Sequence, residues 1–273
     1  MFGSETHETT ETHEFDRPSS LAVETTNGSL TLTAHDESNV VVEAHKRGDS
    51  ERELANARVV AGGTDPLSVE VEHDGGSDAT VSLTVAVPTD LPIERAATTN
   101  GSVEATGVTL RGVETTNGGV ELTDTTGPLS VSSTNGGVTV DGVDGDAELS
   151  TTNGGVEVSS VDGTVTAETD AGSITVREAA AIGDVRTRAG KIDAVVRAID
   201  GDTAVESTTG SVRLRAGPEL DAEVRVSSSV GGVTAPGLSG SDGIVGGAAS
   251  GQVGDGGPTL TVSTQVGSVA FEQ

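Results

Sequence analysis

The sequence predicts an all-β fold: a single-chain β-solenoid (β-helix) with about 18 residues per coil, capped by an irregular β region at the N-terminus. Three observations predict it. A short phrase containing Asn-Gly returns at a nearly fixed period, and the segments between its copies alternate apolar and polar residues. The apolar residues are mostly small or β-branched, since the chain of 273 residues has 38 Gly, no Trp or Tyr and only three Phe. This composition suits strands, turns and a thin core.

The repeated phrase is the first element. It reads TTNGSLTL from Thr25, TTNGSVEA from Thr98, TTNGGVEL from Thr115, STNGGVTV from Ser133 and TTNGGVEV from Thr151. Later copies, such as TDAGSITV, lose the Asn and keep the Gly. We therefore expect a corner at which the Gly has a positive φ and the Asn is a favourable neighbour. The expected structural turn residues are Gly28, Gly101, Gly118, Gly136, Gly154, Gly172, Gly190, Gly210, Asn100, Asn117, Asn135 and Asn153.

The segments between corners form the second element. The phrase Gly recurs regularly from Gly101 to Gly190, and the next two intervals, to Gly210 and Gly231, are slightly longer. A second Gly stands nine residues after the first in three units, at Gly127, Gly145 and Gly163. Alternation between these corners predicts one buried face per strand. The expected inward residues include Val120, Leu122, Val138, Val140, Val156, Val158, Ile174, Val176, Leu129, Val131, Ala147, Leu149, Val165 and Ala167.

Two topologies can use such segments. In a meander of hairpins, Asn-Gly would form two-residue turns between antiparallel strands, and the sheet would close into a barrel or sandwich. In a solenoid, each unit would be one coil whose strands lie parallel to those of the next coil. Equivalent residues then stack on one another, which explains why the inward positions keep their aliphatic character. We favour the solenoid for that reason.

Four regions follow from these patterns. Residues 1–95 are expected to form an N-terminal β region that supplies a cap and the first coils, and residues 96–236 the regular solenoid repeats. Residues 237–258 are Gly-rich and are expected to form a loop. Residues 259–273 return to alternation and are expected to be C-terminal capping strands, with Phe271 closing the final coil. Terminal repeats of solenoids are usually irregular because they cover an open end.

Charge and composition restrict the classes of partner. The formal net charge is −28, from 43 acidic and 15 basic residues, which repels nucleic acid and anionic membranes. The acids are dispersed, so solubility in concentrated salt (a halophilic protein) explains them better than an acidic binding surface does. There is no Cys, no apolar run long enough to span a membrane, and no signal-peptide pattern. We therefore expect a soluble chain without direct membrane insertion, cytoplasmic as given, or at the cell surface if a leader was removed.

The Thr-Thr-Asn-Gly-[Ser/Gly]-Val units, the stretch from Phe15 to Asn27 and the Val87-Pro88 connection resemble a known family. They are similar to the β-strand-repeat putative adhesins, a family of unknown function, in the version typical of salt-loving archaea. The resemblance covers roughly Glu14 to Phe271. It implies a β-helical fold and a role of the adhesin type, and it implies no catalytic residues.

The sequence offers weak candidates for chemistry. His7 and His13 alternate with Glu5 and Glu11, but six residues of strand separate the two His by about 20 Å, too far for one metal ion. No His follows His73, so the repeats lack a Ser–His pair. The repeats also lack the aromatic residues with which carbohydrate-active β-helix enzymes line their clefts. We expect no enzyme activity, no metal site and no cofactor.

One stretch differs in charge from the rest of the chain. Eight of the 15 basic residues lie between Arg177 and Arg225, against nine acids, so this stretch is nearly neutral. The possible partner-binding residues are Arg177, Arg186, Arg188, Arg213 and Arg215. The alternative is ion pairing between coils, such as Asp193 with Arg213, which contributes little to stability.

Three functional hypotheses follow. The first is a non-enzymatic interaction or scaffold protein whose polar solenoid faces bind an unknown protein or glycan. The second is a structural protein that polymerises end to end, because exposed coil ends are unpaired strand edges. The third, a carbohydrate-active β-helix enzyme, is the least favoured. The oligomeric state is not predicted.

Overall fold

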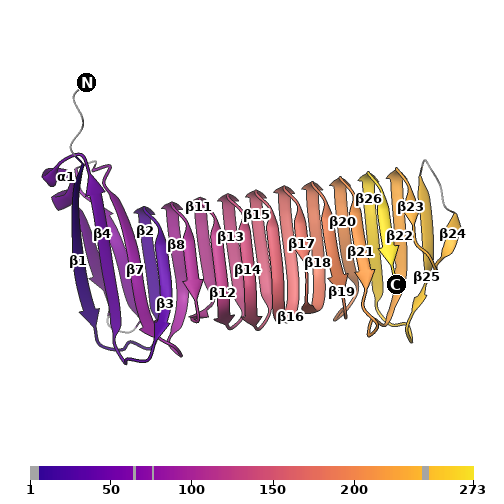
Figure 1. Ribbon diagram of the computed structural model, residues 1–273, viewed down its shortest axis with the longest axis horizontal. Helices are drawn as coiled ribbons and strands as arrows, with labels where there is room; N and C mark the ends of the chain where they lie inside the picture. The colour runs from indigo at the N-terminus through magenta and orange to yellow at the C-terminus, as the bar shows by residue number, and fades with distance from the viewer. Residues whose placement is uncertain (1–5, 64–65, 76, 242–245) are drawn as a thin grey trace, which may run out of the picture. The chain divides into compact units, whose positions relative to one another are not determined.

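The computed structural model describes residues 6–63, 66–75, 77–241 and 246–273. The described chain consists almost entirely of strands, with a single short helix, so the expectation of an all-β fold is confirmed (Figure 1). It divides into two compact units, Met1–Ser133 and Thr134–Gln273. Each unit is described by itself below.

In the first unit, an irregular N-terminal region precedes regular strands. Its elements are β1 (His7–Phe15), β2 (Leu21–Asn27), β3 (Leu30–His35), β4 (Val40–Gly48), α1 (Glu51–Asn56), β5 (Ala57–Gly62), β6 (Leu67–His73), β7 (Thr80–Pro88), β8 (Pro92–Asn100), β9 (Val103–Thr106), β10 (Thr109–Leu110), β11 (Gly112–Asn117) and β12 (Val120–Thr126). Strand β13 (Leu129–Asn135) contains residues of both units.

The second unit contains the remaining strands. They are β14 (Val138–Asp144), β15 (Ala147–Asn153), β16 (Val156–Ala171), β17 (Ile174–Val176), β18 (Ala179–Ala189), β19 (Ile192–Val196), β20 (Thr203–Thr209), β21 (Val212–Ala216), β22 (Ala222–Val230), β23 (Val233–Thr234), β24 (Ser239–Ser241), β25 (Gly247–Val253), β26 (Thr259–Val266) and β27 (Val269–Glu272).

In the regular part of each unit, neighbouring strands pair in parallel, with a register that repeats the sequence period. In the first unit, Val113 of β11 pairs with Ala96 of β8, the equivalent position one repeat earlier. In the second unit, Val156 of β16 pairs in the same way with Val138 of β14. The longer repeat that follows keeps this register, since Val212 of β21 pairs with Ile192 of β19. Asn-Gly therefore joins successive strands of one coil, as in a solenoid-like stack, and does not form a hairpin.

The core is a narrow aliphatic layer. Every inward residue predicted above is buried, each with at most 3% of its surface exposed. Because equivalent positions stack on each other, as Val138 does on Val156, one apolar choice repeats from coil to coil. Small side chains fill most of this space, and Phe271 is a fully buried aromatic residue within it.

At the N-terminal end, the order of strands in the sheet departs from their order in the sequence. Strand β2 lies between β6 and β8, because Val23 pairs in parallel with Val69 on one side and Ala96 on the other. Beyond this coil the pairing becomes antiparallel, with β4 against β7, β1 against β4, and β5 against β6. Helix α1 begins after Ser50, whose hydroxyl accepts a hydrogen bond from the Glu53 amide at 3.3 Å.

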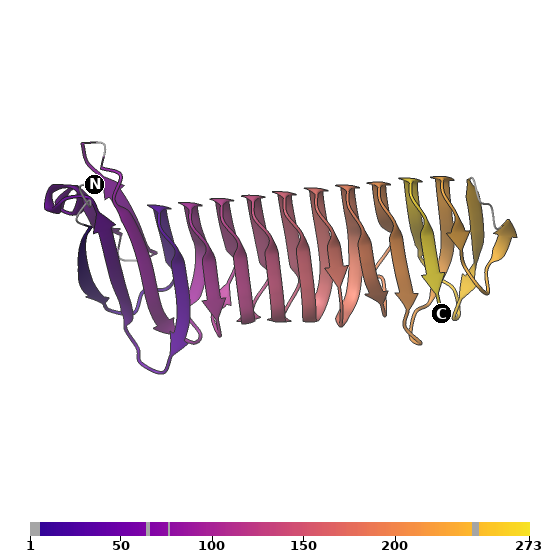
Figure 2. The same ribbon diagram turned by 45° about the horizontal axis from the view of Figure 1, so that its top comes forward.

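The C-terminal part corrects two expectations. The Gly-rich segment 237–258 was expected to be a loop, but it contains β24 and β25, and β25 pairs antiparallel with β22. The segment 259–273 was expected to cap the unit, but β26 lies between β20 and β22 (Figure 1, Figure 2). Phe271 of β27 likewise lies between Leu214 of β21 and β23 and is fully buried. The signal for this insertion is the phrase TQVGSV, whose Gly267 carbonyl lies against Gly231.

The phrase glycines are required for a reason other than the one expected. Gly28 and Gly210 have positive φ values of 145° and 150°. Gly101, Gly118, Gly154, Gly172 and Gly190 have no φ in the left-handed region. At these five positions an added Cβ would lie 1.7–2.1 Å from the carbonyl oxygen of the phrase Gly one coil earlier. Close stacking of backbone, rather than a positive φ, therefore excludes side chains there.

A corner that the sequence analysis missed, called the second corner below, lies six residues after the phrase Gly, between the phrase corner and the expected corner at Gly127, Gly145 and Gly163. Its residues have left-handed backbone: Gly107 and Asp124 in the first unit, and Gly142, Ser160 and Glu178 in the second, with φ between 51° and 77°. Three of these five residues carry a side chain, so no single residue type marks the position. The shared feature is backbone geometry.

Candidate functional site

The first residue of each phrase is a Thr or Ser, and its buried hydroxyl forms a hydrogen bond to the neighbouring coil. Thr151 donates to the Gly136 carbonyl oxygen at 3.0 Å, Thr169 to that of Gly154 at 2.9 Å, and Ser207 to that of Gly190 at 3.0 Å. In the first unit Thr98 bonds the Gly28 carbonyl in the same way at 2.9 Å. Each bond joins one coil to the next and satisfies a carbonyl oxygen at the corner. This part of the phrase is structural.

The phrase asparagines bond to one another. In the first unit Asn100 Nδ2 donates to Asn27 Oδ1 at 2.8 Å, and Asn117 Nδ2 donates to Asn100 Oδ1 at 2.9 Å. In the second unit Asn153 Nδ2 donates to Asn135 Oδ1 at 3.0 Å. Stacking at one strand spacing places each amide within hydrogen-bonding distance of the next. The Asn is therefore part of the contact between coils, in addition to being a turn residue.

The structure distributes the five candidate arginines over two ladders of the second unit. The first ladder consists of β15, the C-terminal part of β16, β18, β20, β26 and β22, and it contains Arg186 and Arg188 on β18. The second consists of β14, the N-terminal part of β16, β17, β19, β21, β27 and β23, and it contains Arg213 and Arg215 on β21. Arg177 directly follows β17. The strand pairing therefore does not place all five arginines in one continuous patch.

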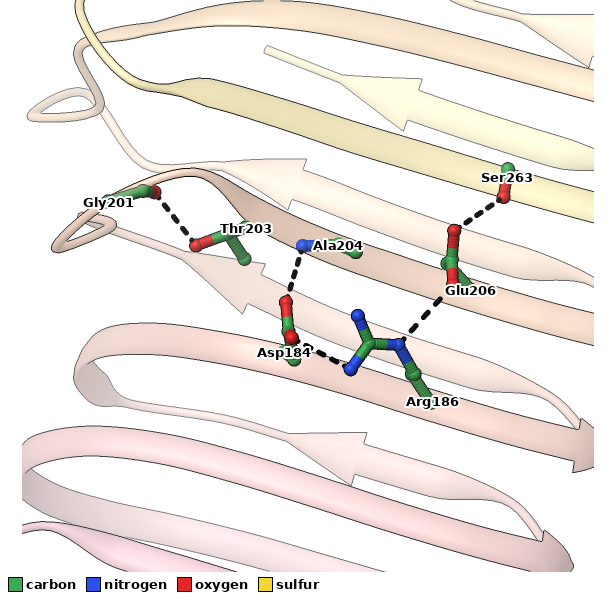
Figure 3. A network of polar contacts seen from close by, with 7 residues as sticks. All are labelled: Asp184, Arg186, Gly201, Thr203, Ala204, Glu206 and Ser263. Atoms are coloured by element: carbon green, nitrogen blue, oxygen red, sulfur yellow. Dashed lines mark hydrogen bonds and ion pairs between the residues drawn. The ribbon is translucent and has the colours of Figure 1, made fainter.

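Arg186 lies in a network of polar contacts on the first ladder (Figure 3). Its guanidinium contacts Asp184 at 2.7 Å and Glu206 at 3.3 Å. Glu206 also accepts a bond from Ser263 at 3.5 Å, and Asp184 accepts one from the Ala204 amide at 2.9 Å. Burial opposes the charged form, but hydrogen bonding and attraction to the two carboxylates outweigh it and raise the pKa of Arg186. The network joins three coils.

The other candidates differ in how they are paired. Arg177 contacts Glu157 at 3.1 Å, and Arg188 contacts Asp170 at 3.1 Å. The expected pair of Asp193 with Arg213 is wrong: these residues are partners in register, but Asp193 contacts Arg215 at 3.0 Å.

Arg215 contacts Glu272 as well, at 3.7 Å. Arg213 is exposed and forms no ion pair with any residue that the structure describes. Arg215, two residues further along β21, contacts Asp193 diagonally across the two strands, so the register partner of Arg213 is already paired.

The first unit contains an arginine that sequence reasoning did not select. Arg95 of β8 lies between Glu24 of β2 and Glu114 of β11, with contacts of 2.7 and 2.8 Å. The hydrogen bond from Arg95 lowers the pKa of Glu114, although burial opposes the shift. The same bond is the largest cause of the raised pKa of Arg95. The signal was the register, since Glu114 pairs with Ala97, two residues after Arg95 on the neighbouring strand.

The histidines of the N-terminal strand do not gather into a metal centre. His7 pairs with Gly48 and His13 with Val42, at opposite ends of β4. No group of three His, Asp or Glu residues suited to a metal ion occurs in residues 6–63, 66–75, 77–241 and 246–273. Lys46, whose side chain is 4% exposed, contacts Glu11 at 2.7 Å. This contact between a buried lysine and a partly exposed carboxylate ties β1 to β4.

The sequence profile of the Toastrack DUF4097 family matches residues 18–271, most of the chain. The chain belongs to this family. The match confirms the family resemblance drawn from the Thr-Thr-Asn-Gly units. A comparison of this Toastrack chain with curated proteins found no match.

Several solved structures are similar to the Toastrack chain. One is a putative adhesin from Bacteroides fragilis, 15% identical, with a TM-score of 0.45 and 97% of each chain covered. Another is a putative lipid binding protein from Parabacteroides distasonis, 9% identical, with a TM-score of 0.44 and 97% of each chain covered. A putative cell adhesion protein from Clostridium sporogenes is 11% identical, with a TM-score of 0.31, 98% of this chain and 100% of the other being covered. Because these TM-scores are below 0.5, the similarities establish no function for this chain.

Within the described part of the Toastrack chain, no helix has the length and apolar character that a membrane-spanning helix needs.

Proposed function

We propose that the protein is a non-enzymatic interaction scaffold of the adhesin type, a β-solenoid with about 18 residues per coil that presents polar faces to a protein or glycan partner. Membership of the Toastrack family supports the proposal, together with the resemblance of the repeated phrase to the β-strand-repeat putative adhesins. The hydrogen-bonded registers also support it, because they hold outward side chains in fixed rows. Rigid rows lose little conformational entropy when they bind a partner.

The observation that carries the proposal is the position of Arg213. It is exposed, it lies on β21 of the second ladder, and its partner in register, Asp193, contacts Arg215 instead. Arg177, Arg186, Arg188 and Arg215 are each already paired with an acid. Among the five candidate arginines, Arg213 therefore offers an anionic group of a partner, such as a uronate or a carboxylate side chain, a guanidinium fork that it can bind without displacing an internal acid.

The test is binding to an array of acidic and neutral glycans, and to surface proteins of the source cells, at low and at molar salt. We expect acidic ligands to be retained and Arg213→Gln to weaken their binding about tenfold, the effect of losing one charge-assisted contact. Arg225→Gln, which removes an exposed arginine on the first ladder, is the matched control and should leave binding unchanged. Equal binding by wild type and Arg213→Gln would contradict the role of Arg213.

Two further properties belong to this proposal. The dispersed acidic residues and the charge of −28 suit a protein from salt-loving archaea. An adhesin-type role also requires display at the cell surface, which protease treatment of intact cells would test. If sedimentation in molar salt instead showed filaments that grow with concentration, the end-to-end polymer would be the better description.

A further inference from the structure

Every Asn of the repeated phrase is followed by Gly. The five pairs are Asn27-Gly28, Asn100-Gly101, Asn117-Gly118, Asn135-Gly136 and Asn153-Gly154. In an Asn-Gly pair the backbone nitrogen of Gly can attack the side-chain carbonyl carbon of Asn, and the missing side chain of Gly removes the usual hindrance. The outward side of this corner therefore carries five copies of a chemically labile dipeptide.

The reaction balances without any enzyme. A bond forms between the Gly nitrogen and Asn Cγ, the Cγ–Nδ2 bond breaks, and the nitrogen's proton leaves with the amide as ammonia. Water from the solvent then opens the resulting succinimide at one of its two carbonyl carbons. The products are aspartate, or isoaspartate, in which the main chain runs through the former side chain.

The stacked coils oppose the first step at the attacking nitrogen. The Gly28 amide donates its hydrogen to the Asn100 carbonyl at 2.8 Å, the Gly101 amide to that of Asn117 at 3.0 Å, and the Gly154 amide to that of Ala171 at 3.0 Å. The nitrogen must lose this hydrogen before it attacks. The hydrogen bond to the next coil must therefore break, and attack requires local opening of the stack.

The Asn side chain is held as well, but to different degrees. Asn100 donates from Nδ2 to Asn27 and accepts at Oδ1 from Asn117. Asn153 donates to Asn135, but its neighbour on the other side is Ala171, which offers no donor from its side chain. The amide of Asn153 is consequently held by one ladder bond, and that of Asn100 by two.

We propose that the phrase asparagines are sites of spontaneous deamidation which the stacked coils hold closed, and that Asn153 is converted faster than Asn100 in the folded protein. Conversion to isoaspartate adds one atom to the main chain between the Asn and the Gly. The stack has no room for it, since even a Cβ on Gly154 would lie 2.1 Å from the Gly136 carbonyl oxygen. A coil converted to isoaspartate cannot restack, so this product permanently marks a chain that has opened.

The experiment follows deamidation of the full chain over time, folded in high salt and unfolded in denaturant at the same pH. Peptide mass spectrometry quantifies each site by the mass gained when an amide becomes a carboxyl. We expect folding to slow conversion at Asn100 at least about tenfold, because each 1.4 kcal/mol of opening free energy lowers the open population about tenfold. Asn153 should be converted faster than Asn100 when folded and at the same rate when unfolded, since both follow Thr-Thr and precede Gly. Equal rates for the folded and unfolded chain would overturn the proposal.

A pair of matched variants tests the ladder itself. Ala171→Asn supplies a new Nδ2 donor toward Asn153 Oδ1, as Asn117 does toward Asn100, and should slow conversion of Asn153. Ala171→Asp has the same shape but only acceptor atoms, and should not slow it. Both variants change the exposed residue Ala171, so folding, checked by circular dichroism, should be retained. Equal conversion of Asn153 in the two variants would show that the side-chain ladder gives no protection.

Discussion

The phrase corner and the second corner of a coil make their turns in different ways. At the phrase corner, Gly154 and Gly172 lie so close to the backbone of the preceding coil that any side chain would overlap it. At the second corner, Gly142, Ser160 and Glu178 share a left-handed backbone, and Ser160 and Glu178 are exposed to solvent. A contact between coils fixes the residue at the first corner absolutely. At the second corner, the left-handed backbone favours Gly but allows other residues, at a cost of about 1–2 kcal/mol for a residue with a side chain.

The largest expected effect is at the phrase corner. Gly154→Ala places a Cβ 2.1 Å from the Gly136 carbonyl oxygen, and we expect it to lower the free energy of unfolding by at least about 3 kcal/mol. The control is Gly137→Ala, whose Cβ would lie 3.5 Å from the nearest backbone atom and should change stability by less than about 1 kcal/mol. Denaturant titration measures both. If the two variants were equally stable, close stacking would not be the reason for the phrase Gly.

A smaller effect of opposite sign is expected at the second corner. Ser160 has a φ of 56°, and Ser160→Gly should raise the free energy of unfolding by about 0.5–1 kcal/mol because Gly adopts this conformation without strain. The reverse substitution one coil earlier, Gly142→Ser, starts from a φ of 77° and should lower it by a similar amount. Thermal and denaturant unfolding check both values. A loss of stability in Ser160→Gly would mean that the serine side chain makes a contribution that outweighs strain.

The smallest expected effect concerns the exposed ion pairs on the outer face. The Arg95 hydrogen bond holds the pKa of Glu114 below its ordinary value of 4.5, so this pair adds stability above that pH and loses it as the pH falls through the lowered value. Both side chains are about half exposed, so we expect less than about 1 kcal/mol. Comparison of Glu114→Gln with wild type from about pH 6 to about pH 3 should show a difference that shrinks on acidification.

The control for this titration is Glu121→Gln on β12, a carboxyl with no ion pair in the part of the chain that the structure describes. It should not reproduce the pH-dependent difference. A constant difference between Glu114→Gln and wild type at all these pH values would assign its effect to packing instead of charge.

Features that recur in every coil could be predicted from the sequence, whereas features that vary between coils or occur once were missed. The inward aliphatic positions and the phrase glycines could be read from periodicity, because stacking imposes the same residue on every coil. The family came from the resemblance of the repeated phrase to known sequences. The second corner escaped notice because its geometry accepts Gly, Ser and Glu alike. The insertion of Thr259–Glu272 between earlier coils was missed because strand order depends on long-range pairing. The partner of Asp193 was wrong by two residues, since a long Arg side chain reaches beyond its own row.

The position of β26 and β27 has a consequence for biosynthesis. Strands β22 and β23 leave the ribosome before the two strands that separate them from β20 and β21 in the finished unit. Early contact between β22 and β20 would fill the space that belongs to β26. The growing chain must therefore either keep this gap open or undo a premature closure, and the pace of translation through Gly237–Pro258 becomes a variable in folding yield.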